Sequence, residues 1–168
     1  MTKEDIKFIA RVIYSEAGPG CSLEDRSLVS RTIENRTKHP GFNVKNVMEA
    51  VEFPRAYSCV NDPKNTNWRE SVAFPAGTLP YPQGIKYDNK IVAFAWNEAW
   101  LFATIRISFE ECGPQIFFDT GKFPVYYHDR SISKPSSWDN KWYHAVKLGE
   151  TDHFIYYAAV PANQEASR

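Results

Sequence analysis

The sequence has no excess of charge of either sign. Its 20 Lys and Arg residues balance its 20 Asp and Glu residues, so the formal net charge at pH 7 is zero. Proteins that bind a polyanion generally carry a basic surface that attracts the phosphates. The balance therefore predicts that nucleic acid is not a partner of this chain.

Long hydrophobic runs are also absent. No apolar stretch approaches the roughly 20 residues that a helix needs to cross a bilayer, which predicts that the chain has no membrane span. Residues 1–5 do not begin a basic segment followed by an apolar one, as an ordinary secretory signal would. If the substrate lies outside the cytoplasm, we therefore expect export by a non-classical route.

Cysteine is scarce, and neither cysteine nor histidine follows a known metal-binding spacing. The three cysteines are widely separated and form no CxxC pair, which argues against a zinc ribbon or a thioredoxin-type redox site; they are Cys21, Cys59 and Cys112. The four histidines form no HExxH motif; they are His39, His128, His144 and His153. The sequence therefore predicts neither a metal site nor a cofactor.

The composition is that of one globular domain. A chain of 168 residues with 43% hydrophobic and 15% aromatic residues can bury a substantial core, so we expect a single domain over residues 1–168. Apolar residues at helical spacing predict a series of helices in the first two thirds of the chain. These helices are expected over 3–17, from Ser22 to about Thr37, in a short segment capped by Asn43, and over 89–108, with a long loop over 52–88.

The last third of the sequence changes to short aromatic and β-branched runs. Strands are predicted over 125–128, 143–148 and 153–157, and residues 149–152 have the composition of a hairpin turn. Helices followed by a small antiparallel β element give an α+β fold class.

Glu16 is the most informative residue of the first predicted helix. The segment Gly18-Pro19-Gly20 ends that helix and leaves Glu16 in its last turn. Free carbonyls there carry about half a negative charge, which disfavours an ionised carboxylate and is expected to raise the pKa of Glu16. A carboxylic acid that stays protonated near neutral pH is suited to act as a general acid. A solvated surface glutamate is the alternative interpretation of the same pattern.

Seven short segments in a fixed order resemble the SleB/CwlJ-type cell wall hydrolases. They are 9–17, Asn35-Arg36, 44–47, 57–62, 125–128, Trp138, and 147–149 with 153–157. The resemblance covers residues 8–157 and implies a lysozyme-like fold. It also implies a substrate, the glycan strand of peptidoglycan, and a bond, the β-1,4 link between N-acetylmuramic acid and N-acetylglucosamine. Its one catalytic carboxylate falls on Glu16.

The resemblance and the strand pattern together suggest substrate-binding residues. These are Tyr57, Ser58, Tyr126, Tyr127, His128 and Trp138. Period two on the strand places Tyr126 and His128 on one face and Tyr127 on the other, and aromatic faces stack well on sugar rings. A second catalytic carboxylate remains open among five acids, namely Glu24, Asp25, Glu34, Glu52 and Asp62.

A single acid/base permits two products. Attack by the muramic C6 hydroxyl gives a 1,6-anhydro end, the outcome of a lytic transglycosylase, whereas attack by water gives hydrolysis, the outcome of a muramidase. An antibacterial effector or a phage lytic enzyme would fit such an activity. An effector would imply a cognate immunity protein as a partner.

The sequence is also compatible with two other functions. Cys59 and His128 would form the dyad of a wall amidase or peptidase if they met. The aromatic residues would alternatively serve a non-catalytic module that binds peptidoglycan without cutting it.

Overall fold

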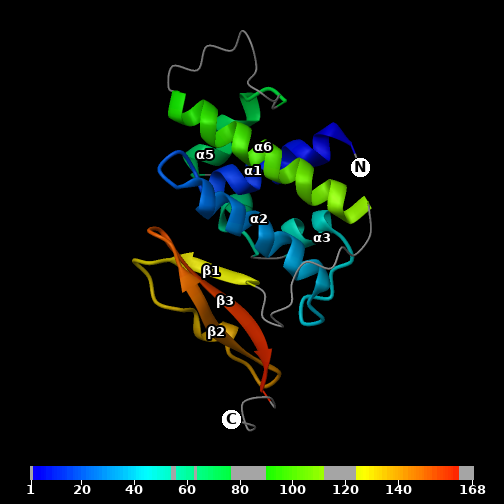
Figure 1. Ribbon diagram of the computed structural model, residues 1–168, viewed down its shortest axis with the longest axis vertical. Coiled ribbons are helices and arrows are strands. Elements are labelled where there is room, and N and C mark those ends of the chain that lie inside the picture. The colour runs from blue at the N-terminus through cyan, green and yellow to red at the C-terminus, as the bar shows by residue number, and fades with distance from the viewer. Residues whose placement is uncertain (1, 54–55, 63, 77–89, 112–123, 163–168) are drawn as a thin grey trace.

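The computed structural model describes residues 2–53, 56–62, 64–76, 90–111 and 124–162. The helices form one layer, and a three-stranded antiparallel sheet lies against one side of it (Figure 1). This arrangement confirms the predicted α+β class. Within the described residues, no helix has the length and apolarity that crossing a membrane requires.

The first two helices begin where the sequence predicts. Helix α1 covers Lys3–Glu16 and α2 covers Leu23–Lys38. Each has a complete capping box, in which the Thr2 or Ser22 side chain accepts from the N3 amide and the N3 aspartate accepts from the cap amide. These local bonds explain why both starts could be predicted from sequence.

The segment between α2 and the long helix is more helical than predicted. Helix α3, Val47–Glu52, is capped by Asn46 and not by Asn43, whose positive φ of 48° places it in a turn. The expected loop over 52–88 was wrong in part, because it contains three short helical segments. They are α4 (Ser58–Asn61), α5 (Thr66–Glu70) and the 3₁₀ turn η1 (Ser71–Ala73). Residues 77–89 lie outside the described part of the chain.

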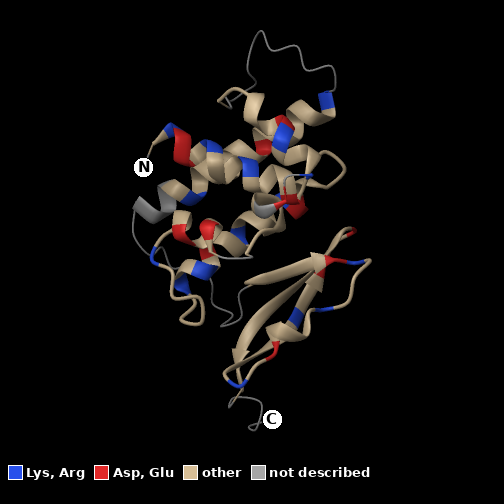
Figure 2. Ribbon diagram, turned by 180° about the vertical axis from the view of Figure 1, so that it is seen from behind, with Lys and Arg blue, Asp and Glu red and all other residues tan. Residues whose placement is uncertain are grey.

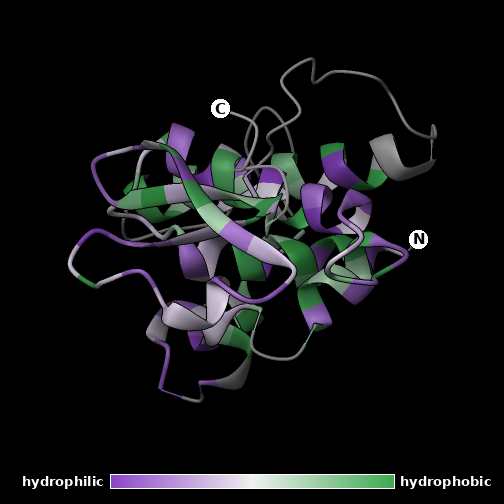
Figure 3. Cartoon of the chain, turned by 90° about the horizontal axis from the view of Figure 1, so that it is seen from below, coloured by the Kyte–Doolittle hydropathy of each residue, from purple (hydrophilic) through white to green (hydrophobic). Residues whose placement is uncertain are grey.

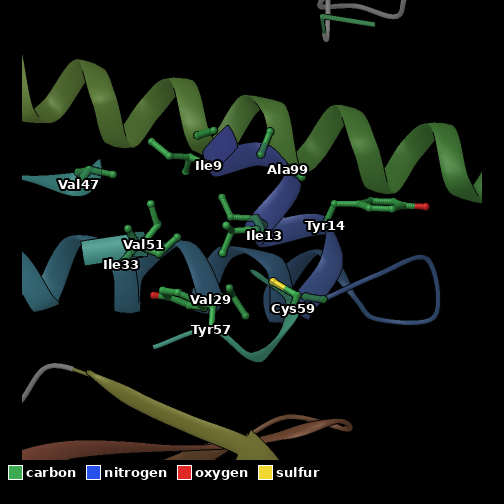
Figure 4. Close-up of a cluster of buried hydrophobic side chains, with 14 of the residues drawn as sticks. Ile9, Ile13, Tyr14, Val29, Ile33, Val47, Val51, Tyr57, Cys59 and Ala99 are labelled. Atoms are coloured by element: carbon green, nitrogen blue, oxygen red, sulfur yellow. The ribbon is translucent and has the colours of Figure 1, made fainter. Parts of the chain in front are cut away.

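Helix α6, Lys90–Glu111, is the longest helix and packs on both α1 and α2. Its buried face contains Ala95, Ala99 and Ala103, and small side chains let helices approach closely. Buried side chains of α1, among them Ile9 and Ile13, fill the space beneath it, as Figure 4 shows. This core is the rigid support from which the end of α1 extends.

The sheet has the strand order β1-β3-β2, with both pairs antiparallel. Strand β1 covers Tyr126–Asp129, β2 covers Tyr143–Glu150 and β3 covers Phe154–Pro161. All three predicted strands are therefore present, although the hairpin turn begins after Glu150 and not at Gly149, where the register shifts by a bulge. A second 3₁₀ turn, η2 (Ser136–Trp138), follows β1. Connecting loops around the sheet are largely hydrophilic (Figure 3).

Candidate active site

A groove with a volume of about 740 Å³ runs between the helical layer and the sheet. Its size is within the range of small-molecule and cofactor sites. Its lining combines one carboxylate from the end of α1, aromatic residues from β1 and the η2 loop, and side chains that follow α2 and α3. The residues that matter below are Glu16, Ser58, Tyr126, Tyr127, His128, Asp129 and Trp138.

Glu16 is the last residue of α1, as the sequence predicts, and its side chain is half-buried in this groove. One carboxyl oxygen, Oε1, accepts a hydrogen bond from the Cys59 amide at 3.1 Å, and the Ser58 hydroxyl lies 3.5 Å from the same atom. The other oxygen, Oε2, accepts from the Tyr127 hydroxyl at 3.0 Å. The start of α4 and strand β1 thus fix the orientation of one carboxyl group.

Tyr127 is suited to act as a permanent donor to Glu16. Burial raises the pKa of its hydroxyl well above the ordinary value, and the negative charge of Glu16 raises it further. The hydroxyl therefore keeps its proton throughout the neutral range. Tyr127 consequently contacts the candidate acid directly, on the opposite side from the Cys59 amide.

Another segment approaches the loop after Glu16 closely. A Cβ atom on Gly18 would lie 2.4 Å from the side-chain amide nitrogen of Asn67, so a larger residue there would displace the Asn67 side chain. Arg26 of α2 then holds this loop, since its Nη1 donates to the carbonyls of Ala17, Gly18 and Cys21. The positive charge at the C-terminal end of α1 also compensates the helix dipole.

Arg36 lines the groove and joins the helices to the segment that leads into the sheet. Its Nε donates to the Val125 carbonyl at 2.9 Å and its Nη1 to the Ala56 carbonyl at 3.3 Å. The guanidinium also lies over the ring of Tyr57, with its carbon 4.6 Å from the centroid. Arg36 therefore braces α2 against the chain segments before α4 and β1.

Tyr57 differs from its predicted role in substrate binding. The side chain is only 1% exposed and belongs to the core, on the side that faces the sheet (Figure 4). Its hydroxyl lies 3.5 Å from that of Thr32, inside the protein. Tyr57 therefore supports the wall of the groove from behind, whereas the neighbouring Ser58 is exposed and lines it.

An aromatic shelf, formed by Tyr126 and Trp138, lies along the sheet side of the groove. Their rings are stacked with centroids 4.8 Å apart and planes at 13°. His128 lies on the same side, 5.7 Å from Trp138, while Tyr127 points the other way, toward Glu16. The alternation predicted from period two is therefore present. Such a flat, half-exposed surface can stack on a sugar ring.

The structure does not bring Cys59 and His128 together as a dyad in any described contact. Burial raises the pKa of the Cys59 thiol, and the nearby carboxylate of Glu16 raises it further, which disfavours a thiolate nucleophile. The imidazole of His128 is engaged elsewhere: Nδ1 donates to the Asp129 carbonyl at 2.7 Å and Nε2 lies 3.0 Å from the Tyr157 hydroxyl. His128 is 6% exposed and acts mainly as a structural part of the groove wall.

Asp129 is a groove-lining carboxylate that the sequence analysis missed. It lies two residues after Tyr127 on β1, hence on the same face and about 6.8 Å further along the strand. That spacing was the available signal. Hydrogen bonds from Ser131 hold the pKa of Asp129 below its ordinary value, so it is ionised at neutral pH.

The five acids considered in the sequence occupy other places. Asp25 completes the cap of α2, and Glu34 pairs with Lys38 and Arg106. Glu24, Glu52 and Asp62 are exposed and are not among the groove-lining residues. Glu16 and Asp129 are thus the two carboxylates that line the described groove.

The arrangement can transfer a proton to and from a ligand held in the groove. Glu16 is oriented by two protein donors, yet each carboxyl oxygen retains a further lone pair for a proton or a ligand. No protein-family model, no curated protein and no solved structure matches this chain.

Proposed function

We propose that this protein cleaves the glycan strand of peptidoglycan, with Glu16 as the general acid and base. The proposal rests mainly on one observation: the carboxyl group of Glu16, fixed by the Cys59 amide and the Tyr127 hydroxyl, faces a groove that also presents an aromatic shelf. Positioned acids of this kind are what glycosidic bond cleavage requires.

The choice of peptidoglycan follows from the resemblance to SleB/CwlJ-type cell wall hydrolases. The residues that carry this resemblance include Glu16, Ser58, the segment 125–128 and Trp138, and each of them contributes to the groove. The proposed bond is the β-1,4 link between N-acetylmuramic acid and N-acetylglucosamine. A lysozyme-like fold is part of the same proposal.

The reaction begins with proton transfer from Glu16 to the glycosidic oxygen, which lets the leaving sugar depart as its C4 alcohol. The carboxylate that remains then removes a proton from the nucleophile that attacks C1. The Tyr127 hydroxyl and the Cys59 amide stabilise this carboxylate while it waits for that proton.

The nucleophile decides which of two products forms. If the muramic C6 hydroxyl attacks C1, Glu16 acts alone and the product is a 1,6-anhydro sugar. Asp129 favours a second outcome, because an ionised carboxylate on the face of β1 that carries Tyr127 can support water or positive charge at C1. The product of that route is a reducing end.

The test is digestion of purified bacterial walls, followed by mass spectrometry of the released muropeptides. The native protein is expected to release muramic ends, anhydro or reducing, and the Glu16→Gln variant is expected to fold, bind walls and release none. Glu70→Gln is the matched control, since Glu70 is also the last residue of a helix but is exposed and outside the groove lining.

Three results would contradict the proposal. The first is near-normal cleavage by Glu16→Gln. The second is amine release without new sugar ends, which would indicate an amidase or peptidase. The third is wall binding without any product, which would indicate a non-catalytic peptidoglycan-binding module.

The proposed place of action is the bacterial cell wall. An exported antibacterial effector or a phage lytic enzyme fits this activity. For an effector, a cognate immunity protein is expected to cover the groove and prevent contact between Glu16 and the glycan.

A further inference from the structure

A second group of reactive side chains lies at the junction between α2 and the β2–β3 hairpin, apart from the Glu16 hydrogen bonds. Cys21 precedes the cap of α2, Asp25 lies in its first turn, and His153 follows the hairpin turn. One ligand atom from each residue, a thiol sulfur, a carboxylate oxygen and an imidazole nitrogen, lies within 4.8 Å of the other two. We propose that Cys21, Asp25 and His153 bind a zinc ion.

The geometry favours a metal over a catalytic relay. In a Cys-His-Asp relay the thiol and the carboxylate lie at opposite edges of the imidazole, so they do not approach each other. Here the thiol sulfur, the carboxylate oxygen and the imidazole nitrogen all lie within 4.8 Å of one another. Bond lengths of about 2.0–2.3 Å place neighbouring ligands of tetrahedral zinc roughly 3–4 Å apart, so a small side-chain rotation closes the site.

The residues differ in burial in a way that suits this closure. Asp25 is fully buried and held by the amide and hydroxyl of Ser22, while Cys21 and His153 are only half-buried and can move toward it. Without a metal, the His153 Nδ1–H donates to Asp25 at 2.9 Å. Cys21 and His153 are also reachable from solvent, which gives an ion a path of entry.

The surroundings of the cluster carry excess negative charge. The charged groups close to the Cys21 thiol are the carboxylates of Asp25 and Asp129 and the guanidinium of Arg26. Arg26 is already paired with Glu98. Figure 2 shows acidic residues on both sides of this junction. A divalent cation would balance this charge and displace the thiol proton to solvent as it binds.

Zinc is the expected ion because the ligands are a thiolate, an imidazole and a carboxylate. This set suits zinc and does not suit magnesium or calcium, which prefer oxygen ligands. The ion would tie the first turn of α2 to the hairpin and so fix the spacing between the two walls of the groove. Asp25 and His153 are separated by 128 residues along the chain, which is why no local spacing predicted the site.

The test is zinc binding to the full reduced chain after treatment with a chelator. Calorimetry is expected to give one site per chain, and cobalt is expected to give a thiolate charge-transfer band together with visible bands of tetrahedral coordination. Zinc at 100 times its Kd is expected to raise the Tm by about 5–10 °C.

Substitutions of Cys21 and His153 test where the ion binds, and they leave the Asp25 cap of α2 intact. Cys21→Ser and His153→Gln are each expected to lower the affinity at least tenfold. Cys112→Ser and His144→Gln are the matched controls, and both should bind as the native chain does. Circular dichroism verifies that all four variants are folded.

The proposal is overturned if no saturable site is found, if Cys21→Ser or His153→Gln binds zinc as the native chain does, or if either control loses binding. These measurements do not involve wall cleavage. Failure of the zinc site therefore leaves the proposed role of Glu16 untouched, and the reverse also holds.

Discussion

Arg26 is predicted to be the residue whose loss most disturbs the end of α1. Its guanidinium is 6% exposed and contacts the Glu98 carboxylate at 2.6 Å. It also donates to the carbonyls of Ala17, Gly18 and Cys21, which are the acceptors of the loop directly after Glu16. One side chain therefore pairs with a half-buried carboxylate and three carbonyls.

The magnitude follows from these contacts. Removing one partner of a buried ion pair costs about 3–5 kcal/mol, and the 27% exposure of Glu98 moves that contribution to the lower end. Losing a charged donor to buried carbonyls adds about 1–2 kcal/mol. Arg26→Met should therefore lower the free energy of unfolding by about 4 kcal/mol, with a fall in Tm of roughly 8–16 °C. Arg26→Lys retains the charge but not the planar fork, and should cost about half as much.

Urea denaturation followed by tryptophan fluorescence measures these changes. A second substitution, Glu98→Leu, removes the unpaired carboxylate and should restore part of the stability lost in Arg26→Met, but not the part due to the carbonyls. A cost below about 1 kcal/mol for Arg26→Met would refute the reasoning, because it would mean that the described contacts do not hold the loop.

Three further predictions concern the groove and its support. Tyr127→Phe removes the hydroxyl donor to Glu16, a charge-assisted hydrogen bond of about 1.5–3 kcal/mol. The kcat for wall cleavage should therefore fall about 10- to 100-fold, with KM nearly unchanged. An unaltered kcat would contradict this prediction. Trp138→Ala should raise KM about 3- to 10-fold, the value of one aromatic stacking contact, and Trp138→Phe should retain most of the binding in co-sedimentation with walls. Burial raises the pKa of Glu34, but Lys38 and Arg106 outweigh it and hold that pKa below its ordinary value of 4.5. The ionised Glu34 carboxylate therefore stabilises the folded state fully above pH 4.5, and this stabilisation is lost as pH falls through the folded-state pKa. Glu34→Gln should flatten the acid side of a plot of Tm against pH. An unchanged acid side would be evidence against this assignment.

Features that depend on neighbouring residues could be predicted from the sequence alone. The two capping boxes, the stop after Glu16 and the alternation of Tyr126, Tyr127 and His128 all arise from hydrogen bonds or side-chain directions within a few residues. The same local physics located the candidate acid at the end of α1. The short helices after residue 52 were missed, because segments this short are stabilised by packing and not by propensity.

Only the tertiary structure decided which side chains meet. It buried Tyr57 behind the groove, placed Asp129 in it, and held Cys59 and His128 in separate contacts. It also joined α2 to the hairpin through Asp25 and His153, far apart in the chain. The physical reason is that a sequence pattern fixes the direction of a side chain relative to its own helix or strand, whereas the distance between two elements depends on how their buried faces pack.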